Sequence, residues 1–282
     1  MPDSILLHHI GELATLEGGP RRGAREMNNL GIMHDAAVLI EDGIIEEVGP
    51  SDKLLREAPL GTGKIHCGGR AVVPGFIDAH THAVFAGDRV DEFAQKLEGA
   101  SYAEILANGG GILRTVRLTR EGSRADLLKG LLSRLSSMME HGTTTVEVKS
   151  GYGLDLETEK RLLEVVRAAD ERHPMDLVAT FMGAHAVPPE FADARSYAKH
   201  VADVMVPAVA ELAEFVDVFC EHGVFDPESA RLVLEAGAQQ GMRVKVHADE
   251  LANSGGSMLA ADLGAVSADH LLHAGSKERT AL

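Results

Sequence analysis

The feature that most constrains the fold is a repeated alternation of short apolar strands with amphipathic helices between residues 72 and 270. Leucines at helical spacing over residues 124–141, for example, precede a run of β-branched residues at 143–148. The expected strands cover residues 72–82, 143–148, 177–181, 216–220, 243–246 and 266–270. Short apolar strands that alternate with helices of this size predict a parallel sheet built from six strand-to-helix units.

Polar and ionisable side chains gather where each of these strands ends. They are His80 and His82, Lys149 and Tyr152, His185, Glu221 and His222, His247 and Glu250, and His270. In a (β/α)8 barrel the carboxyl ends of all strands lie at one face, where the active site is built. A doubly wound sheet brings six strand ends around one point less readily, and no glycine-rich nucleotide fingerprint follows the first strand. We therefore expect an α/β protein with a TIM-like barrel.

His80 and His82 are two residues apart at a strand end, so their side chains can face the same point. By itself the pair is equally consistent with two surface histidines. His247 supplies a third imidazole, and three imidazoles with an open position for water are typical of a catalytic metal site. Glu250 can move protons there, and His270 can polarise a carbonyl or act as an acid. This residue set suits attack of water on an amide or amidine carbon.

The first 70 residues form a β-rich region. Residues 37–41 and 44–48 flank Asp42-Gly43, and β-prone runs around Asp-Gly predict a hairpin because both turn residues need a positive φ. The excursion over residues 88–119 contains Asn108-Gly109-Gly110-Gly111, which fits an active-site loop or a flexible turn equally well.

Composition argues against several classes of protein. The formal net charge of −16 disfavours nucleic acid and anionic membrane surfaces as partners, and no stretch reaches the length of a membrane span. Two cysteines far apart fit a reducing compartment without disulfides. The first residues show no basic start followed by a long apolar run. We expect a cytoplasmic protein with no nucleic-acid or membrane partner.

Six stretches carry a closer likeness to a known family. They are HTHAVFAGDR (residues 80–89), NGGGI (108–112), VEVKSGYGLD (146–155), FMGAHAVPPE (181–190), KVHADEL (245–251) and SADHLLH (267–273). Together with PGFIDAHTH, they resemble the imidazolonepropionase family of the amidohydrolase superfamily over essentially residues 5 to 273. A generic amidohydrolase would share only the histidines, so the resemblance is specific.

The resemblance implies roles for individual residues. His80, His82 and His247 would hold one divalent or trivalent metal ion, zinc or iron. Glu250 and His270 would be the catalytic residues beside the scissile bond. The implied substrate-binding residues are Arg89, Tyr102, Tyr152, His185 and Glu250. The implied reaction is hydrolysis of 4-imidazolone-5-propanoate to N-formimidoyl-L-glutamate in histidine degradation, and the family's usual state makes a homodimer one expectation.

Chemistry supports some of these roles and leaves alternatives for others. Arg89 offers a two-pronged match for a propionate carboxylate, although the acidic chain as a whole would not steer an anion. Packing at a loop is the alternative for Tyr102 and Tyr152, and a buried structural histidine is the alternative for His185. A structural role is favoured for Lys149, which ends the second strand rather than the fourth, where a metal-bridging lysine would be expected.

The chain departs from the family pattern after residue 273. Full-length members continue through two more units, and their eighth strand carries an aspartate that completes the metal site, which neither Asp262 nor Asp269 matches by position. We therefore expect a barrel with about six of its eight units over residues 71–282. A partial β-sandwich domain is expected over residues 1–70, with the hairpin lacking its partner strands. Two alternatives stay open: another amidohydrolase such as a heterocycle deaminase, and an inactive fragment without the last barrel strands.

Overall fold

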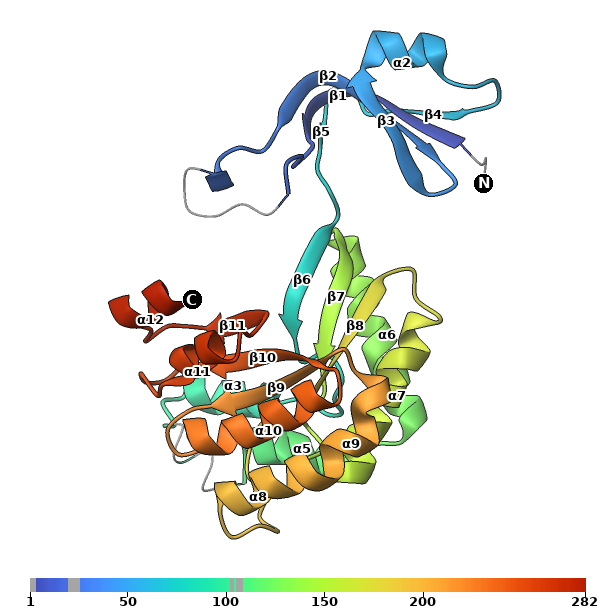
Figure 1. The fold of residues 1–282 in the computed structure, drawn as a ribbon. Helices are drawn as coiled ribbons and strands as arrows, with labels where there is room; N and C mark the ends of the chain where they lie inside the picture. Colours follow the sequence, from blue (N-terminus) through green and yellow to red (C-terminus); the bar gives the residue numbers. More distant parts are fainter. Residues whose placement is uncertain (1–3, 20–25, 102–103, 105–108) are drawn as a thin grey trace. The chain divides into compact units, whose positions relative to one another are not determined.

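The computed structural model describes residues 4–19, 26–101, 104 and 109–282. It divides the chain into two compact units, Met1–Gly75 and Phe76–Leu282, each with a sheet of its own (Figure 1). Among the described residues, no helix combines the length and the apolar composition needed to cross a bilayer.

The first unit is built on a five-stranded sheet with the order β3-β2-β1-β4, in which β5 also pairs with β1. Its elements are β1 (Ser4–Ala14), β2 (Ile32–Glu41), β3 (Ile44–Pro50), α2 (Ser51–Glu57), β4 (Gly63–His66) and β5 (Ala71–Val72). The predicted hairpin is confirmed, because β2 and β3 pair antiparallel around Asp42-Gly43 with φ values of 49° and 80° at the turn.

Within the described residues, β3 of the hairpin lies at the edge of the sheet, whereas β2 has a second partner strand. β2 pairs with β1 along most of its length. The physical reason is a small apolar core that forms within this unit, where Leu6 of β1 and Leu39 of β2 pack with Leu54 of α2.

The second unit contains a parallel six-stranded sheet in which the strand order follows the chain, from β6 to β11. Its strands are β6 (Phe76–Thr81), β7 (Thr143–Lys149), β8 (Asp176–Ala184), β9 (Phe215–Cys220), β10 (Arg243–Ala248) and β11 (Ser267–His270). The sheet curves into a nearly closed barrel, so that Lys245 Nζ of β10 donates a hydrogen bond to the Ala79 carbonyl of β6 at 3.3 Å. The predicted TIM-like architecture with six strand-to-helix units is confirmed.

Helices follow the parallel strands, and all but the last helix lie between one strand and the next in the chain (Figure 1). They are α3 (Val90–Leu97), α5 (Ile112–Glu121), α6 (Arg124–Glu140), α7 (Leu156–Asp170), α8 (Ala194–His200), α9 (Val206–Val209), α10 (Pro227–Gln239), α11 (Gly256–Asp262) and α12 (Ser276–Ala281). Four of them begin at a side chain that accepts a hydrogen bond from the backbone N–H three residues on, namely Ser123, Asp155, Asp193 and Asp226. Such caps satisfy one of the unpaired N–H groups at a helix start.

Two segments differ from the sequence prediction. The excursion over residues 88–119 contains α3 and α5, whose apolar residues recur at helical spacing. The helical segment between β8 and β9, where the alternation of strands and helices predicts one helix, is interrupted by a π-helical turn, η1 (Val201–Met205), and ends in a 3-10 turn, η2 (Ala210–Leu212). Pro207 has no N–H to donate to the preceding turn, which accounts for the irregularity there.

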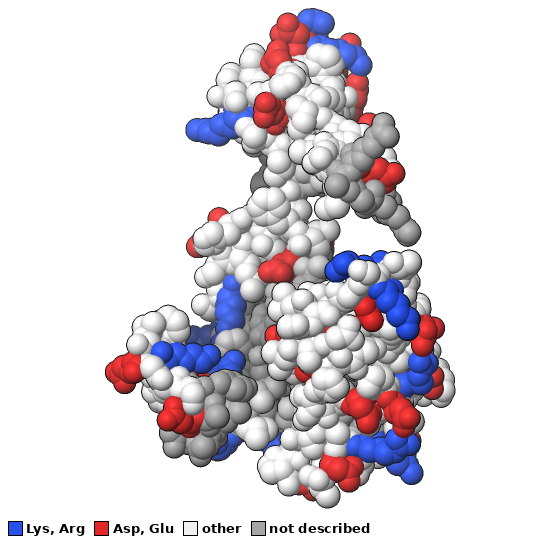
Figure 2. Space-filling model, turned by 90° about the vertical axis from the view of Figure 1, so that its left-hand side faces the viewer, with Lys and Arg blue, Asp and Glu red and all other residues white. Residues whose placement is uncertain are grey.

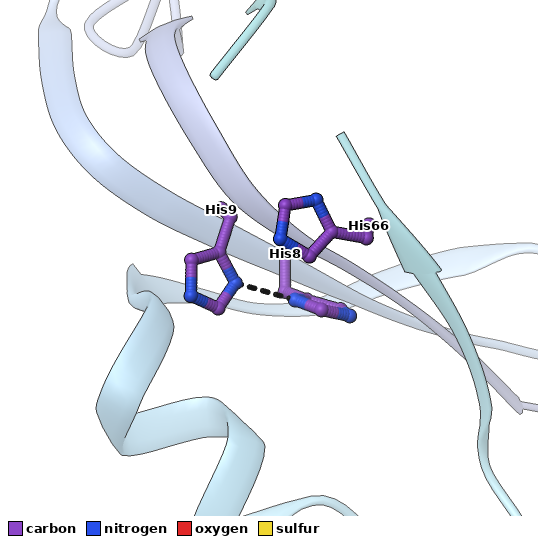
Figure 3. Close-up of side chains that lie close together, drawn as sticks. All are labelled: His8, His9 and His66. Carbon is purple, nitrogen blue, oxygen red and sulfur yellow. Dashed lines mark hydrogen bonds between the residues drawn. The ribbon is translucent and has the colours of Figure 1, made fainter. Parts of the chain in front are cut away.

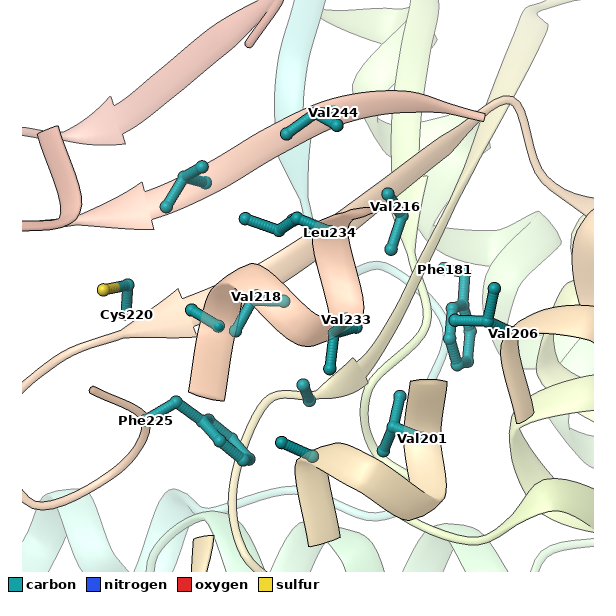
Figure 4. Packing of buried hydrophobic residues seen from close by; sticks show 14 of the residues in the cluster. Phe181, Val201, Val206, Val216, Val218, Cys220, Phe225, Val233, Leu234 and Val244 are labelled. Atoms are coloured by element: carbon teal, nitrogen blue, oxygen red, sulfur yellow. The ribbon is translucent and has the colours of Figure 1, made fainter. Parts of the chain in front are cut away.

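The strands of the second unit place apolar and polar residues on opposite faces. Val216 and Val218 of β9 pack with Val233 and Leu234 of α10 in the core between the sheet and the helices (Figure 4). The alternate positions are also buried but ionisable, namely Glu147 and Lys149 of β7, Asp217 of β9, and Lys245 and His247 of β10. Because side chains alternate along a strand, these ionisable groups share the inner face of the barrel.

Charged side chains of both signs lie on the surface. On the face shown in Figure 2, Lys and Arg side chains are interspersed with Asp and Glu over each unit. Both signs of charge are therefore mixed on this face, although the formal net charge of the whole chain is −16.

Packing of α6 predicts a large effect of one substitution. Leu131 is completely buried in the core of the second unit. Leu131→Ala should lower the free energy of unfolding by about 2–5 kcal/mol, because it removes buried methyl groups and leaves a cavity. Met139→Ala, at a position of the same helix that is 40% exposed, should change it by less than about 0.5 kcal/mol. Urea unfolding followed by circular dichroism measures both, and equal losses would contradict this packing.

Candidate metal centre

The three histidines predicted as metal ligands lie close together. His80 is on β6, His82 follows its last residue, and His247 is buried on β10. The ring centroids of His80 and His247 are 4.4 Å apart, and those of His82 and His247 are 5.3 Å apart. β6 and β10 are not neighbours in the sheet, so the curvature of the barrel brings these imidazoles together.

The donor atoms of two of these rings fit one metal ion. The Nε2 atoms of His82 and His247 are 3.2 Å apart, and two imidazole nitrogens bound to a tetrahedral zinc ion at about 2.0–2.1 Å are about 3.3 Å apart. Burial, followed by the charges of His185 and His247, holds the pKa of His82 far below its ordinary value. The ring is therefore neutral, as a ligand must be. Its buried Nδ1 has no hydrogen-bond partner within the described chain.

Two carboxylates lie next to the Nδ1 atoms of two proposed ligand histidines. Nδ1 of His80 is hydrogen-bonded to Oδ2 of Asp269 at 2.8 Å, and Oδ2 of Asp217 lies 3.0 Å from Nδ1 of His247. A histidine whose Nδ1 faces a carboxylate keeps Nε2 for the metal, and the carboxylate fixes the ring's orientation and tautomer. By its position in the sequence, Asp269 does not match the aspartate that completes the family's metal site. The structure nevertheless places Asp269 against a predicted ligand.

Asp217 also anchors a buried ionic network. Lys149 Nζ lies 2.8 Å from Oδ2 of Asp217 and 2.8 Å from Oε1 of Glu147, and Lys245 Nζ lies 3.1 Å from the second oxygen of Glu147. Burial lowers the pKa of Lys149, but the charges of Asp217 and Glu147 outweigh it and raise that pKa overall. Likewise, burial opposes ionisation of Asp217, yet the charges of His247 and Lys149 hold its pKa well below the usual range.

These network residues were missed as a group when the sequence was read alone. The available signal was the alternation Val-Glu-Val-Lys, Val-Asp-Val and Val-Lys-Val within the strands at residues 146–149, 216–218 and 244–246. Because valines at alternate positions mark the helix-facing side, the charged residues between them had to share the opposite face.

His270 and Glu250 lie beside the three histidines. The ring centroid of His270 is 5.1 Å from those of both His80 and His247, and its Nε2 is 3.5 Å from Oε2 of Glu250. Ligand atoms of His80, His247 and His270 all lie within 4.8 Å of one another. Burial lowers the pKa of His270 although the charge of Glu250 opposes this, so the imidazole is neutral at pH 7.

The backbone at His270 is unusual for a residue with a side chain. Its φ is 74°, a left-handed conformation that costs about 1–3 kcal/mol and persists only where the surroundings impose it. Asp249, between His247 and Glu250, has a φ of 50° and is held by the N–H groups of Ser254, Gly256 and Ser257. The end of β10, which leads into Glu250, is therefore fixed by specific contacts.

His185 and Tyr152 form one wall of the centre. His185 stacks on His82 with ring centroids 4.8 Å apart and an angle of 18° between planes. Its Nδ1 lies 3.0 Å from the Gly151 carbonyl, to which it donates, so that Nε2 is left as an acceptor. Burial, followed by the charge of His247, lowers the pKa of His185 to about 3. Tyr152 lies 5.3 Å from His185 and 5.7 Å from His82 between ring centroids.

A pocket extends from this wall. It has a volume of about 230 Å³ and is lined by Phe85, Asp88, Arg89, Thr115 and Tyr152. Arg89 precedes α3 and is exposed. Burial raises the pKa of Tyr152 although the charge of Arg89 lowers it, so the phenol keeps its proton beside the guanidinium. Tyr102, the other tyrosine predicted to bind substrate, lies outside the described residues.

The loop that carries Tyr152 is fastened by a buried carboxylate. Glu159 of α7 accepts hydrogen bonds from the N–H groups of Gly151, Gly153 and Leu154 at 2.9, 2.7 and 2.9 Å. It is completely buried, and burial raises its pKa against the effect of these bonds. The same loop supplies the Gly151 carbonyl that orients His185, so Glu159 positions two of the substrate-binding candidates.

The chain resembles curated proteins over nearly all of its length. It is 54% identical over 271 residues to "Imidazolonepropionase" of Haloarcula marismortui, 52% over 279 residues to that of Symbiobacterium thermophilum, and 47% over 286 residues to that of Brevibacillus brevis. These matches cover 95%, 97% and 98% of this chain, but 64%, 65% and 67% of the relatives. The chain thus spans about two thirds of the length of the curated relatives it matches. No family model matches it.

Solved structures share the fold at low sequence identity. Ochratoxinase of A. niger superimposes with a TM-score of 0.62 at 17% identity, covering 99% of this chain and 63% of that chain. The 5-methylcytosine deaminase from Klebsiella pneumoniae gives a TM-score of 0.61 at 18% identity, covering 92% and 57%. Likeness at this level of identity speaks for the architecture alone.

Removal of one network charge should affect both stability and metal binding. Asp217→Asn leaves buried Lys149 short of a partner and His247 without its carboxylate. We expect a loss of about 3 kcal/mol or more in the free energy of unfolding and an affinity for zinc about 10–100-fold weaker. Asp176→Asn, at the exposed start of β8, is the control. Urea unfolding and competition with a chromophoric chelator give the two values, and an Asp217→Asn chain that behaves like the control would refute the network's role.

The hydrogen bonds that Glu159 accepts from the Tyr152 loop lead to a separate prediction. In Glu159→Gln the amide NH2 must face a backbone N–H, which leaves buried donors without an acceptor. The free energy of unfolding should fall by about 1–3 kcal/mol. Glu157→Gln, exposed in the same first turn of α7, should leave it unchanged. Thermal unfolding of the two variants side by side decides the matter, and the idea fails if they unfold alike.

Proposed function

The chain belongs to the imidazolonepropionase family, and on this basis we propose that it catalyses metal-dependent hydrolysis of the cyclic amide of 4-imidazolone-5-propanoate to N-formimidoyl-L-glutamate. The observation that carries the proposal is the meeting of three histidines, His80, His82 and His247, beside a pocket that contains Arg89. Identity of 54% to a curated imidazolonepropionase supports the same substrate.

We propose that His80, His82 and His247 hold one zinc or iron ion. The short distance between the Nε2 atoms of His82 and His247 supports this ligand set. When bound, such an ion supplies a nucleophilic water near neutral pH. Imidazole ligands suit both metals, so metal analysis of the purified chain distinguishes them.

Glu250 and His270 are the proposed proton carriers. Glu250 accepts a proton from the attacking water and returns it to the ring nitrogen that leaves, a shuttle that requires a carboxylate near the reacting carbon. His270 is neutral and donates a hydrogen bond to the carbonyl oxygen, where negative charge develops during attack. The 3.5 Å separation of Glu250 and His270 supports action of both on one small substrate.

The remaining candidates bind the substrate in this proposal. Arg89 pairs with the propionate carboxylate through two parallel hydrogen bonds, and Tyr152 donates its hydroxyl to the same end of the substrate. Nε2 of His185 accepts a hydrogen bond from an N–H of the imidazolone ring. Tyr102 is assigned to substrate binding on the family resemblance alone. The homodimer, the cytoplasmic location and the domain boundary at residue 70 stay predictions.

The test is hydrolysis by the 282-residue chain itself. Chain loaded with zinc or iron is incubated with 4-imidazolone-5-propanoate, and N-formimidoyl-L-glutamate is followed by mass spectrometry. We expect product that disappears on chelation. Arg89→Lys should lower kcat/KM about 10–100-fold, because lysine cannot form the two-pronged pair, whose loss costs about 1.5–3 kcal/mol. Arg124→Lys, exposed at the start of α6, should match the wild-type chain.

Other outcomes separate the alternatives. A folded, metal-loaded chain that forms no product would overturn the proposal and favour the inactive fragment. Release of ammonia from an amino-substituted heterocycle, without turnover of imidazolonepropionate, would favour a deaminase. Arg89 speaks against that alternative, because a heterocycle without a carboxylate gives its guanidinium no partner.

A further inference from the structure

Three histidines of the first unit form a cluster that the proposed function does not use. His8 and His9 of β1 and His66 of β4 point toward one another (Figure 3), and one ring nitrogen from each lies within 4.8 Å of the others. The rings of His9 and His66 are stacked, with centroids 4.5 Å apart, and the ring of His8 lies 4.9 and 5.0 Å from them. We propose that this cluster is a second metal site, which takes a divalent late first-row transition ion such as zinc, nickel or copper.

A β-bulge explains how two consecutive residues reach the same site. Neighbouring residues of a regular strand point to opposite faces. In β1 the register against β2 shifts between Leu7 and Ile10, and His9 has a φ of 53°, as expected where an extra residue is inserted into one strand. His66 is the register partner of His8 in the parallel pairing of β1 with β4. The bulge thus turns both β1 histidines toward the third.

The strained conformation of His9 is fixed by its surroundings. Its N–H donates to Oγ of Ser51 at 2.9 Å, and that buried hydroxyl donates to the Ala36 carbonyl at 2.8 Å. Its carbonyl accepts from the N–H of Gly69 at 2.9 Å. A left-handed residue other than glycine costs about 1–2 kcal/mol, and such strain concentrates at functional sites. The backbone conformation that brings the three histidines together therefore costs free energy, whereas packing alone would favour a regular strand.

The available donor atoms suit a transition ion. Nδ1 of His66 accepts a hydrogen bond from the N–H of Gly68 at 2.9 Å, which leaves Nε2 for a metal. Burial, followed by the charges of His9 and His66, lowers the pKa of His8 and keeps it in the neutral form that binds metal. Imidazole donors select zinc, nickel or copper over calcium and magnesium, which require oxygen.

The metal-free arrangement is tighter than the bound one would be. Nδ1 of His8 and Nδ1 of His9 are 2.6 Å apart, as in a pair that shares one proton. Ligands of a tetrahedral zinc ion are about 3.3 Å apart, so binding through these nitrogens would break the hydrogen bond, move its proton to Nε2 of the same ring and rotate the two rings outward. Neither ring is fully buried, and His66 is exposed, so the rotation meets little resistance. The ion would then tie β1 to β4.

Counting bound metal tests the proposal. Metal-free 282-residue chain is dialysed against micromolar zinc, and zinc per chain is determined by mass spectrometry of the metal. We expect His66→Gln to bind one zinc ion fewer than the wild-type chain. His34→Gln is the matched control, because His34 is exposed on β2 of the same unit and lies outside the cluster. Equal zinc content in His66→Gln and wild type would overturn the proposal.

Two further variants keep the result interpretable. His8→Gln removes a different ligand and should lose the same ion, which guards against a folding defect of one variant. His82→Gln should lose only the ion of the second unit, so the losses in His66→Gln and His82→Gln should add in the double variant. Copper(II) bound to His82→Gln should show nitrogen couplings in its electron paramagnetic resonance spectrum that weaken when His66→Gln is added; unchanged couplings would refute ligation by His66.

Discussion

The carboxylate of Asp217 is the contact on which the second unit depends. It joins Lys149 of β7 to His247 of β10 from its own place on β9, and its other oxygen accepts the N–H of His247 at 3.1 Å. Burial of charges is costly unless each finds a partner, so this inner face is stable only when all members of the network are present. The same contact orients a proposed metal ligand, which couples the stability of the barrel to the chemistry at its rim.

Much of the fold could be predicted from local pattern. Strand and helix periodicity identified the six units, and Asp42-Gly43 identified the hairpin, because both signals lie within a few residues. The partners of Asp217 could not be found in this way, since Lys149 and His247 are remote from it in sequence and reach it only when the strands pair in the sheet. His80, His82 and His247 could be predicted as one group because the strand ends of a parallel barrel share one face. Asp269 could not, because the family's metal-site aspartate lies on the eighth strand and Asp269 lies on the sixth.

The histidine cluster of the first unit could not be predicted from the sequence pattern. His8 and His9 would lie on opposite faces of a regular strand. The neighbouring sequence does not indicate the β-bulge that brings their side chains to the same site. The two clusters of histidines thus arise from different geometry: curvature of a sheet in the second unit and a local irregularity of one strand in the first. Only the former follows from general rules about parallel barrels.

The formal charge of the inner face of the barrel gives it one more property. Glu147, Asp217 and Asp269 carry three negative charges and Lys149 and Lys245 two positive ones, so their sum, −3 + 2, is −1. A divalent cation brought among them makes the total +1. If the proposed metal site were filled, these five groups together with the ion would therefore not repel a small anionic ligand, although the chain is acidic overall.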